Sequence, residues 1–142
     1  MAFNIATWNI NSVRLRADLV CKLLKNVEID VLCLQECKSP VEKIPLDVFS
    51  EIGFSHLVAR GQKGYNGVAI LSKFPLQEKS AIDFAGLGHA RHIAAQLENG
   101  VTIHNFYVPA GGDEPDRQKN EKFDQKLNYL TEMKDYFSKN VP

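Results

Sequence analysis

Two short apolar runs constrain the fold of this 142-residue chain more than any other feature of its sequence. Residues 31–34 (VLCL) and 68–71 (VAIL) are apolar at every position. Side chains alternate between the two faces of a sheet, so a strand that is apolar throughout is covered on both faces. Each run is far shorter than the ~20 apolar residues that cross a bilayer. The sequence therefore predicts a buried sheet in an α/β protein, with neither a transmembrane helix nor a membrane partner.

The order of elements along the chain predicts one mixed sheet with helices packed on one face. Strands are expected at residues 3–8, 31–34, 56–60, 68–72, 76–83, 92–97 and 101–108, and helices at 13–25, at 46–52 and after 116. Ser12 and Asp116 are the expected caps of the first and last helices, and Asn99-Gly100 predicts a hairpin. The expected apolar stripe of the last helix is Phe123, Leu127, Leu130, Met133 and Phe137.

Three helices can cover only one face of such a sheet, which leaves its second face without a partner layer. The two apolar runs nevertheless require cover on both faces. The chain also stops shortly after the long last helix, at residues 140–142. We therefore expect a truncated α/β sandwich rather than a complete small domain.

Charge and cysteine content exclude several classes of protein. Seventeen basic and seventeen acidic residues cancel, which argues against a uniformly basic nucleic-acid binder but leaves room for a local basic patch. Cys21, Cys33 and Cys37 include no C-x-x-C pair and no histidine at metal-ligand spacing, so free thiols are expected. The N-terminal residues lack the basic and apolar regions of a secretion signal. These features together favour a cytoplasmic protein.

Polar residues lie at the ends of several expected strands, in segments 7–14, 34–38, 64–72 and 104–109. Ligand sites of α/β proteins form where such strand ends share one rim, and Asn9, Glu36 and Tyr107 would then meet in one cleft. Each residue alone has an ordinary structural interpretation: a solvated glutamate, a turn asparagine or a core tyrosine. Only their joint occurrence favours a catalytic site.

Five motifs together, TWNINSVR, LQECK, GYNGVAILS, ARHI and NFYVPAG, resemble the exonuclease III branch of the endonuclease/exonuclease/phosphatase family. The resemblance extends over the whole chain. It implies a four-layer α/β sandwich of two packed sheets. Residues 1–142 would then be the N-terminal part of a single domain whose C-terminal half is absent.

The resemblance also implies roles for individual residues. Glu36 is similar to the metal-binding carboxylate of the family, and Asn9 to the amide beside it, with magnesium or manganese as the cofactor. Tyr107 is similar to the tyrosine that hydrogen-bonds the scissile phosphate or its leaving oxygen. Positions expected to contact phosphate or the DNA backbone are Asn11, Arg14, Gln35 and Arg91.

The activity implied is that of a DNA-repair hydrolase, which cuts phosphodiesters beside abasic sites and removes nucleotides from 3′ ends. The expected partner is duplex DNA with such sites or ends, and no obligate protein partner is indicated. In the family, an aspartate in a G-D-x-N segment and a C-terminal Asp-His pair activate water, and this chain has no G-D-x-N. We therefore expect the 142 residues alone to be inactive. Ala110 also departs from the family, which often has asparagine there.

Two other functions remain open from the sequence. Some relatives resemble catabolite repression control proteins, RNA-binding regulators that keep the fold without nuclease activity. A phosphatase or sphingomyelinase of the same superfamily fits less well, because LQECK and GYNGVAILS are similar to the nuclease branch. The catalytic aspartate and histidine of a second half would separate nuclease from regulator.

Overall fold

The computed structural model describes residues 2–140 and divides them into two compact units. The first unit comprises residues 2–82 and 90–107, and the second comprises 83–89 and 108–140. The first contains all the strands of the described residues and the candidate site.

Sheet A of the first unit is a mixed sheet with the strand order β1-β2-β4-β3. Its strands are β1 (Ile5–Asn9), β2 (Val31–Gln35), β3 (His56–Arg60) and β4 (Val68–Ser72). Strand β1 runs parallel to β2, whereas β4 is antiparallel to both β2 and β3. Every residue of β2 and of β4 is buried, as their uninterrupted apolar sequences predict.

Helices cover one face of sheet A. Helix α1 (Ala17–Asn26) packs through Val20 and Leu24, which lie one turn apart, and the short α2 (Leu46–Ser50) packs through Phe49. These side chains form one apolar cluster with alternate residues of β2 and β4. Between α1 and α2 along the chain, β2 is followed by a short 3₁₀ turn, η1 (Val41–Lys43).

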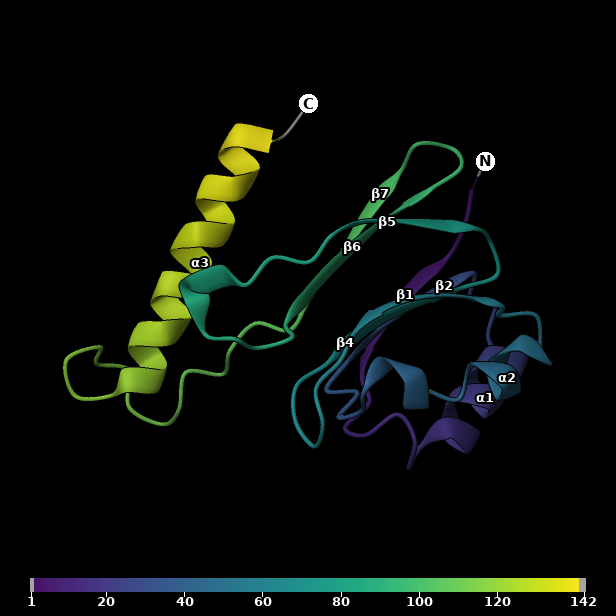
Figure 1. The fold of residues 1–142 in the computed structure, drawn as a ribbon, viewed down its shortest axis with the longest axis horizontal. Helices are drawn as coiled ribbons and strands as arrows, with labels where there is room; N and C mark the ends of the chain where they lie inside the picture. The colour runs from purple at the N-terminus through teal and green to yellow at the C-terminus, as the bar shows by residue number, and fades with distance from the viewer. Residues whose placement is uncertain (1, 141–142) are drawn as a thin grey trace. The chain divides into compact units, whose positions relative to one another are not determined.

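Sheet B covers the other face. It is antiparallel in the order β5-β6-β7, with β5 (Leu76–Ser80), β6 (His92–Leu97) and β7 (Thr102–Phe106). The predicted hairpin at Asn99-Gly100 joins β6 to β7. Figure 1 shows sheet A between α1 and α2 on one side and β5, β6 and β7 on the other. Side chains of both sheets form the second apolar cluster, which includes Val31, Cys33, Ile70, Ile93, Ala95 and Ile103.

The α/β class, the mixed sheet and the helices on one of its faces are confirmed, but the expectation of a single sheet with a bare second face is corrected. Strand β4 is already paired on both sides, with β2 and with β3. The strands that follow β4 pair with one another as sheet B, and apolar side chains of the two sheets pack together. The chain itself therefore covers both faces of β2 and β4.

The start of helix α1 also differs from the prediction. The helix begins at Ala17 rather than near residue 13, and Ser12 is not its cap. Ser12 has a φ of 83°, and its backbone N–H donates to the Glu36 carbonyl at 2.8 Å. The Val13 N–H likewise donates to the Cys37 carbonyl at 3.1 Å. Contacts with a distant loop thus override the local helix signal.

The second unit contains the 3₁₀ turn η2 (Phe84–Gly86) and the long helix α3 (Glu121–Asn140). The helix begins at Glu121, after Asn120, whose Oδ1 accepts the Lys122 N–H at 3.1 Å, so the prediction of Asp116 as its cap is wrong. Its buried residue is Tyr129, with the Phe84 ring edge-on at 5.4 Å, whereas Leu130 of the predicted stripe is 39% exposed. Within residues 2–140, the structure contains no helix that combines the length and apolarity needed to cross a membrane.

Candidate active site

The candidate site lies where β1 and β2 end and β4 begins. Backbone hydrogen bonds continue past the strands and hold their loops together: the Ile10 N–H donates to the Gln35 carbonyl at 2.9 Å. The Lys38 N–H similarly donates to the Asn66 carbonyl at 2.8 Å. The polar loops that follow the two parallel strands therefore share one ordered rim.

Left-handed backbone conformations concentrate at this rim. Residues other than glycine with positive φ here are Asn11 (47°), Ser12 (83°), Glu36 (54°), Lys38 (52°) and Asn66 (52°). Each costs about 1–2 kcal/mol for a residue with a Cβ atom. Such strain persists only where the surroundings over-determine it, and it clusters at functional sites. The local backbone thus marks the rim as a candidate site independently of its side chains.

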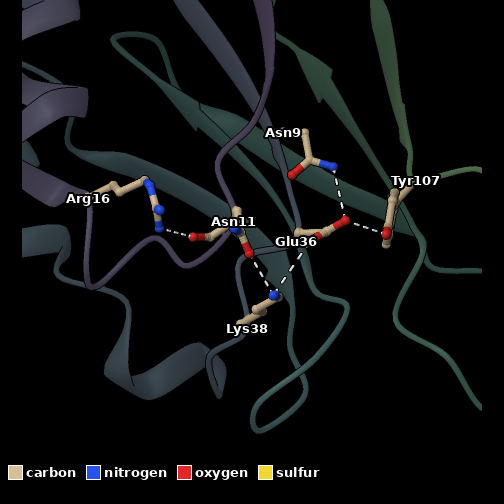
Figure 2. A network of polar contacts seen from close by, with 6 residues as sticks. All are labelled: Asn9, Asn11, Arg16, Glu36, Lys38 and Tyr107. Carbon is tan, nitrogen blue, oxygen red and sulfur yellow. Dashed lines mark hydrogen bonds and ion pairs between the residues drawn. The ribbon is translucent and has the colours of Figure 1, made fainter.

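Glu36 is the centre of a polar network at the rim (Figure 2). Its Oε1 accepts hydrogen bonds from the Asn9 amide at 3.2 Å and from the Tyr107 hydroxyl. Its Oε2 lies 3.7 Å from the Lys38 ammonium, which also donates to the Asn11 Oδ1 at 2.5 Å. Side chains from the ends of β1, β2 and β7 therefore converge on one carboxylate.

These contacts set the charge of the site. The Tyr107 hydrogen bond lowers the pKa of Glu36, and Asn9 and Lys38 add to this effect against the opposing effect of burial. Burial raises the pKa of the Tyr107 phenol, and the neighbouring Glu36 raises it further. At neutral pH the pair is therefore a carboxylate that accepts and a phenol that donates.

Arg91 packs on Tyr107. Its guanidinium carbon lies 4.6 Å from the centre of the Tyr107 ring, in cation–π geometry. Its Nη1 donates to the Tyr107 carbonyl at 3.2 Å, and the Tyr107 N–H donates to the Arg91 carbonyl at 2.7 Å. Arg91 thus lies beside the site and supports the tyrosine.

Gln35 lies beneath the site rather than on its surface. It is 8% exposed, and its amide nitrogen donates to the Thr7 hydroxyl at 2.9 Å and to the Asn105 Oδ1 at 2.8 Å. Both amide protons are therefore used inside the protein. This placement differs from the expected contact between Gln35 and the DNA backbone.

The remaining predicted residues lie at the edge of the network. Arg14 is exposed, and its guanidinium donates to the Lys38 carbonyl at 3.4 Å. Asn11 is linked to Glu36 through Lys38. Two residues of the network, Lys38 and Arg16, were not among the predicted site residues. The Arg16 guanidinium donates to the Asn11 carbonyl. The position of Lys38 two residues after Glu36 was the available signal.

A family model described as the Endonuclease/Exonuclease/phosphatase family matches residues 6–137 of this chain. The chain belongs to this family. The matched segment contains Asn9, Glu36 and Tyr107, which the structure brings into direct contact.

Named relatives of the chain are nucleases and a phosphatase. Exodeoxyribonuclease III of Haemophilus influenzae is 30% identical over 145 residues, covering 94% of this chain and 50% of that protein. An AP endonuclease structure from Archaeoglobus fulgidus has a TM-score of 0.88 at 36% identity, with 99% of this chain and 53% of that chain covered. The 3′ phosphatase NExo from Neisseria, bound to product DNA hairpin, has a TM-score of 0.78 at 35% identity, with coverages of 92% and 49%. The chain therefore spans about half the length of these proteins.

Proposed function

We propose that this chain is the N-terminal part of a metal-dependent DNA-repair nuclease, a 3′-5′ exodeoxyribonuclease and abasic-site endonuclease of the exonuclease III type. The observation that carries the proposal is the Glu36 carboxylate, kept ionised by Tyr107 and Asn9 at a rim of adjacent strand ends. Membership of the endonuclease/exonuclease/phosphatase family supports it.

The donor atoms at the site fit magnesium or manganese. Glu36 Oε2 and the amide oxygen of Asn9 are hard oxygen ligands of the kind that Mg²⁺ takes, one or two from protein and the rest from water and phosphate. The Lys38 ammonium, 3.7 Å from Oε2, would move aside for the ion. The described residues 2–140 contain no cluster of three or more His, Cys, Asp or Glu side chains, so water and substrate phosphate would supply most of the ligands. When bound, the ion would neutralise charge on the phosphate and on the leaving oxygen.

The other side chains would bind and orient the substrate. The Tyr107 hydroxyl can turn from Glu36 to donate to a phosphate oxygen, and Arg91 beside it supplies a positive charge for the same group. Arg14 and Lys38 would contact the DNA backbone without reading its sequence. Duplex DNA with abasic sites or 3′ ends is the proposed substrate, in the cytoplasm.

We further propose that residues 1–142 form part of one domain, completed by a second half such as the twice-longer relatives have. Strand β1 is an edge of sheet A, and Ile5 on it is 48% exposed. A groove of about 500 Å³ runs along this edge, lined by residues 4–8 together with Leu23 and Val27. The second half would cover this edge and supply the base that activates water. Without that base we expect hydrolysis to be slower by ~10²–10⁴.

The test uses Glu36→Ala in a protein that joins this chain to the second half of the family domain. We expect metal-dependent cleavage of an abasic-site duplex to fall by about 10²-fold or more, because a transition-state contact is lost. The melting temperature should stay near that of the parent protein. Glu42→Ala is the matched control, because Glu42 is an exposed glutamate in η1 that makes none of the contacts of the network.

Two outcomes would contradict the proposal. Activity of Glu36→Ala within about threefold of the parent protein at limiting magnesium would exclude Glu36 from the metal site. Tight nucleic-acid binding by the parent protein without any metal-dependent cleavage would instead favour the RNA-binding regulator.

A further inference from the structure

A buried asparagine of sheet B makes directional contacts with sheet A directly beneath the candidate site. Asn105 of β7 is 2% exposed, and its amide nitrogen donates to the Leu34 carbonyl at 3.0 Å and to the Ala69 carbonyl at 2.8 Å. Its Oδ1 accepts the Gln35 amide at 2.8 Å. Leu34 and Ala69 are opposed residues of β2 and β4, so one side chain of sheet B holds two neighbouring strands of sheet A.

This contact differs in kind from its surroundings. The cluster between the sheets consists of apolar residues such as Val68, Ile70, Ile93 and Ile103. Apolar burial is non-directional, so it fixes the spacing of two layers more strongly than their alignment. Hydrogen bonds, by contrast, hold the two heavy atoms within about 2.7–3.2 Å and weaken steeply when the donor angle falls below ~120°. Asn105 can therefore define how far β7 is displaced along β2.

The sequence positions of these residues connect them to the site. Asn105 precedes Tyr107 by two residues, Thr7 precedes Asn9 by two, and Gln35 directly precedes Glu36. Residues two apart on a strand share a face. The hydrogen-bonded row Thr7–Gln35–Asn105, in which Gln35 and Asn105 are buried, therefore neighbours the row Asn9–Glu36–Tyr107 and joins the same three strands.

We propose that Asn105 is a positioning residue, which holds β7 in the alignment that brings the Tyr107 hydroxyl onto Glu36. A displacement of β7 by a fraction of the ~3.3 Å rise per residue would take the hydroxyl out of hydrogen-bond range. Gln35 extends the same link to β1 through Thr7. The importance of Asn105 for catalysis rests on the proposed nuclease function. Its effect on the position of Tyr107 does not depend on that function.

The test measures the Tyr107 environment by NMR in the chain with ¹³C-labelled tyrosine. Tyr107→Phe identifies the Tyr107 resonance, and Glu36→Gln gives its position when the carboxylate acceptor is replaced. We expect Asn105→Leu to move the resonance toward the Glu36→Gln position. The matched control is Ile103→Val, a buried residue two positions earlier on the same face of β7, which should leave the resonance in place.

Asn105→Asp provides a second variant of nearly the same size, for use if Asn105→Leu does not fold. It removes both N–H donors to Leu34 and Ala69, and we expect the same displacement of the Tyr107 resonance. An unmoved resonance in a folded Asn105 variant would overturn the proposal. An equal displacement in Ile103→Val would also overturn it, because any loss of packing would then suffice.

A separate measurement distinguishes this proposal from the proposed function. If Glu36 binds a divalent metal, Mn²⁺ should broaden the Tyr107 resonance in the parent chain and not in Glu36→Gln. No broadening would count against the metal site alone. The response of the Tyr107 resonance to Asn105 substitution, measured without metal, would still decide the role of Asn105.

Discussion

Tyr107→Phe should destabilise the protein in a pH-dependent way. The substitution removes only the hydroxyl that donates to Glu36 and keeps the ring that packs beneath Arg91. A hydrogen bond to a charged group contributes about 1.5–3 kcal/mol, against about 1 kcal/mol between neutral groups. The Glu36 side chain is 22% exposed, so the lower end of the first range applies. We expect a loss of about 1.5 kcal/mol at neutral pH.

The sign of the pH dependence follows from the Glu36 pKa. Its folded-state pKa is lowered from 4.5, first by the Tyr107 hydrogen bond. A carboxyl with a lowered pKa adds stability above its unfolded pKa, and this stability is lost as the pH falls through the folded value. The penalty of Tyr107→Phe should therefore be full at neutral pH and shrink below pH 4.5.

Urea unfolding at a series of pH values, with EDTA present, measures this penalty as the difference in unfolding free energy between parent and variant. The Glu36→Gln background is the control, because without the carboxylate the same Tyr107→Phe step should cost a nearly constant amount. A penalty that stays equal from neutral pH to below pH 4 in the parent background would refute the assignment of Tyr107 as the donor that keeps Glu36 ionised.

Three further predictions test other parts of the fold. Gly67 and Gly100 have similar positive φ values of 94° and 91°, but a Cβ on Gly67 would lie 3.3 Å from Cys37 Cβ, whereas the space at Gly100 is open. Gly67→Ala should therefore lower the free energy of unfolding more than Gly100→Ala does. Equal decreases, measured by urea unfolding, would contradict the close packing at Gly67. Burial lowers the pKa of His92 from 6.5 to about 4, so unfolding free energy should fall by up to about 3 kcal/mol as the pH drops from 6.5 to 4, and His92→Gln should flatten that curve. Tyr129→Ala should lower the free energy of unfolding by about 3 kcal/mol, because Tyr129 is buried, and Leu130→Ala by less than about 0.5 kcal/mol, because Leu130 is 39% exposed. The reverse order would favour the predicted apolar stripe of α3, in which Leu130 is buried.

Local sequence patterns determined several features that the structure confirms. The runs at residues 31–34 and 68–71 predicted strands covered on both faces, and β2 and β4 are buried throughout. Asn99-Gly100 predicted the β6–β7 hairpin. These signals lie within a few residues of the structure they specify. Strand-end polarity also predicted that Asn9, Glu36 and Tyr107 meet, as they do, although Tyr107 reaches Glu36 from the end of β7 in sheet B rather than from a neighbouring strand of sheet A.

Tertiary structure alone decided which layers cover the strands and which polar groups face inward. An apolar pattern indicates that a strand face is covered, but it does not identify the element that covers it. Sheet B was therefore not predicted as a separate layer. Gln35 follows an apolar run and reads as a surface polar residue, yet Thr7 and Asn105 hold it inside. Ser12 has a strong local preference as a helix cap, but a backbone bond to Glu36 holds it in a turn. In each case the deciding partner is more than twenty residues away, and pairings over such separations leave no periodic trace in a single sequence.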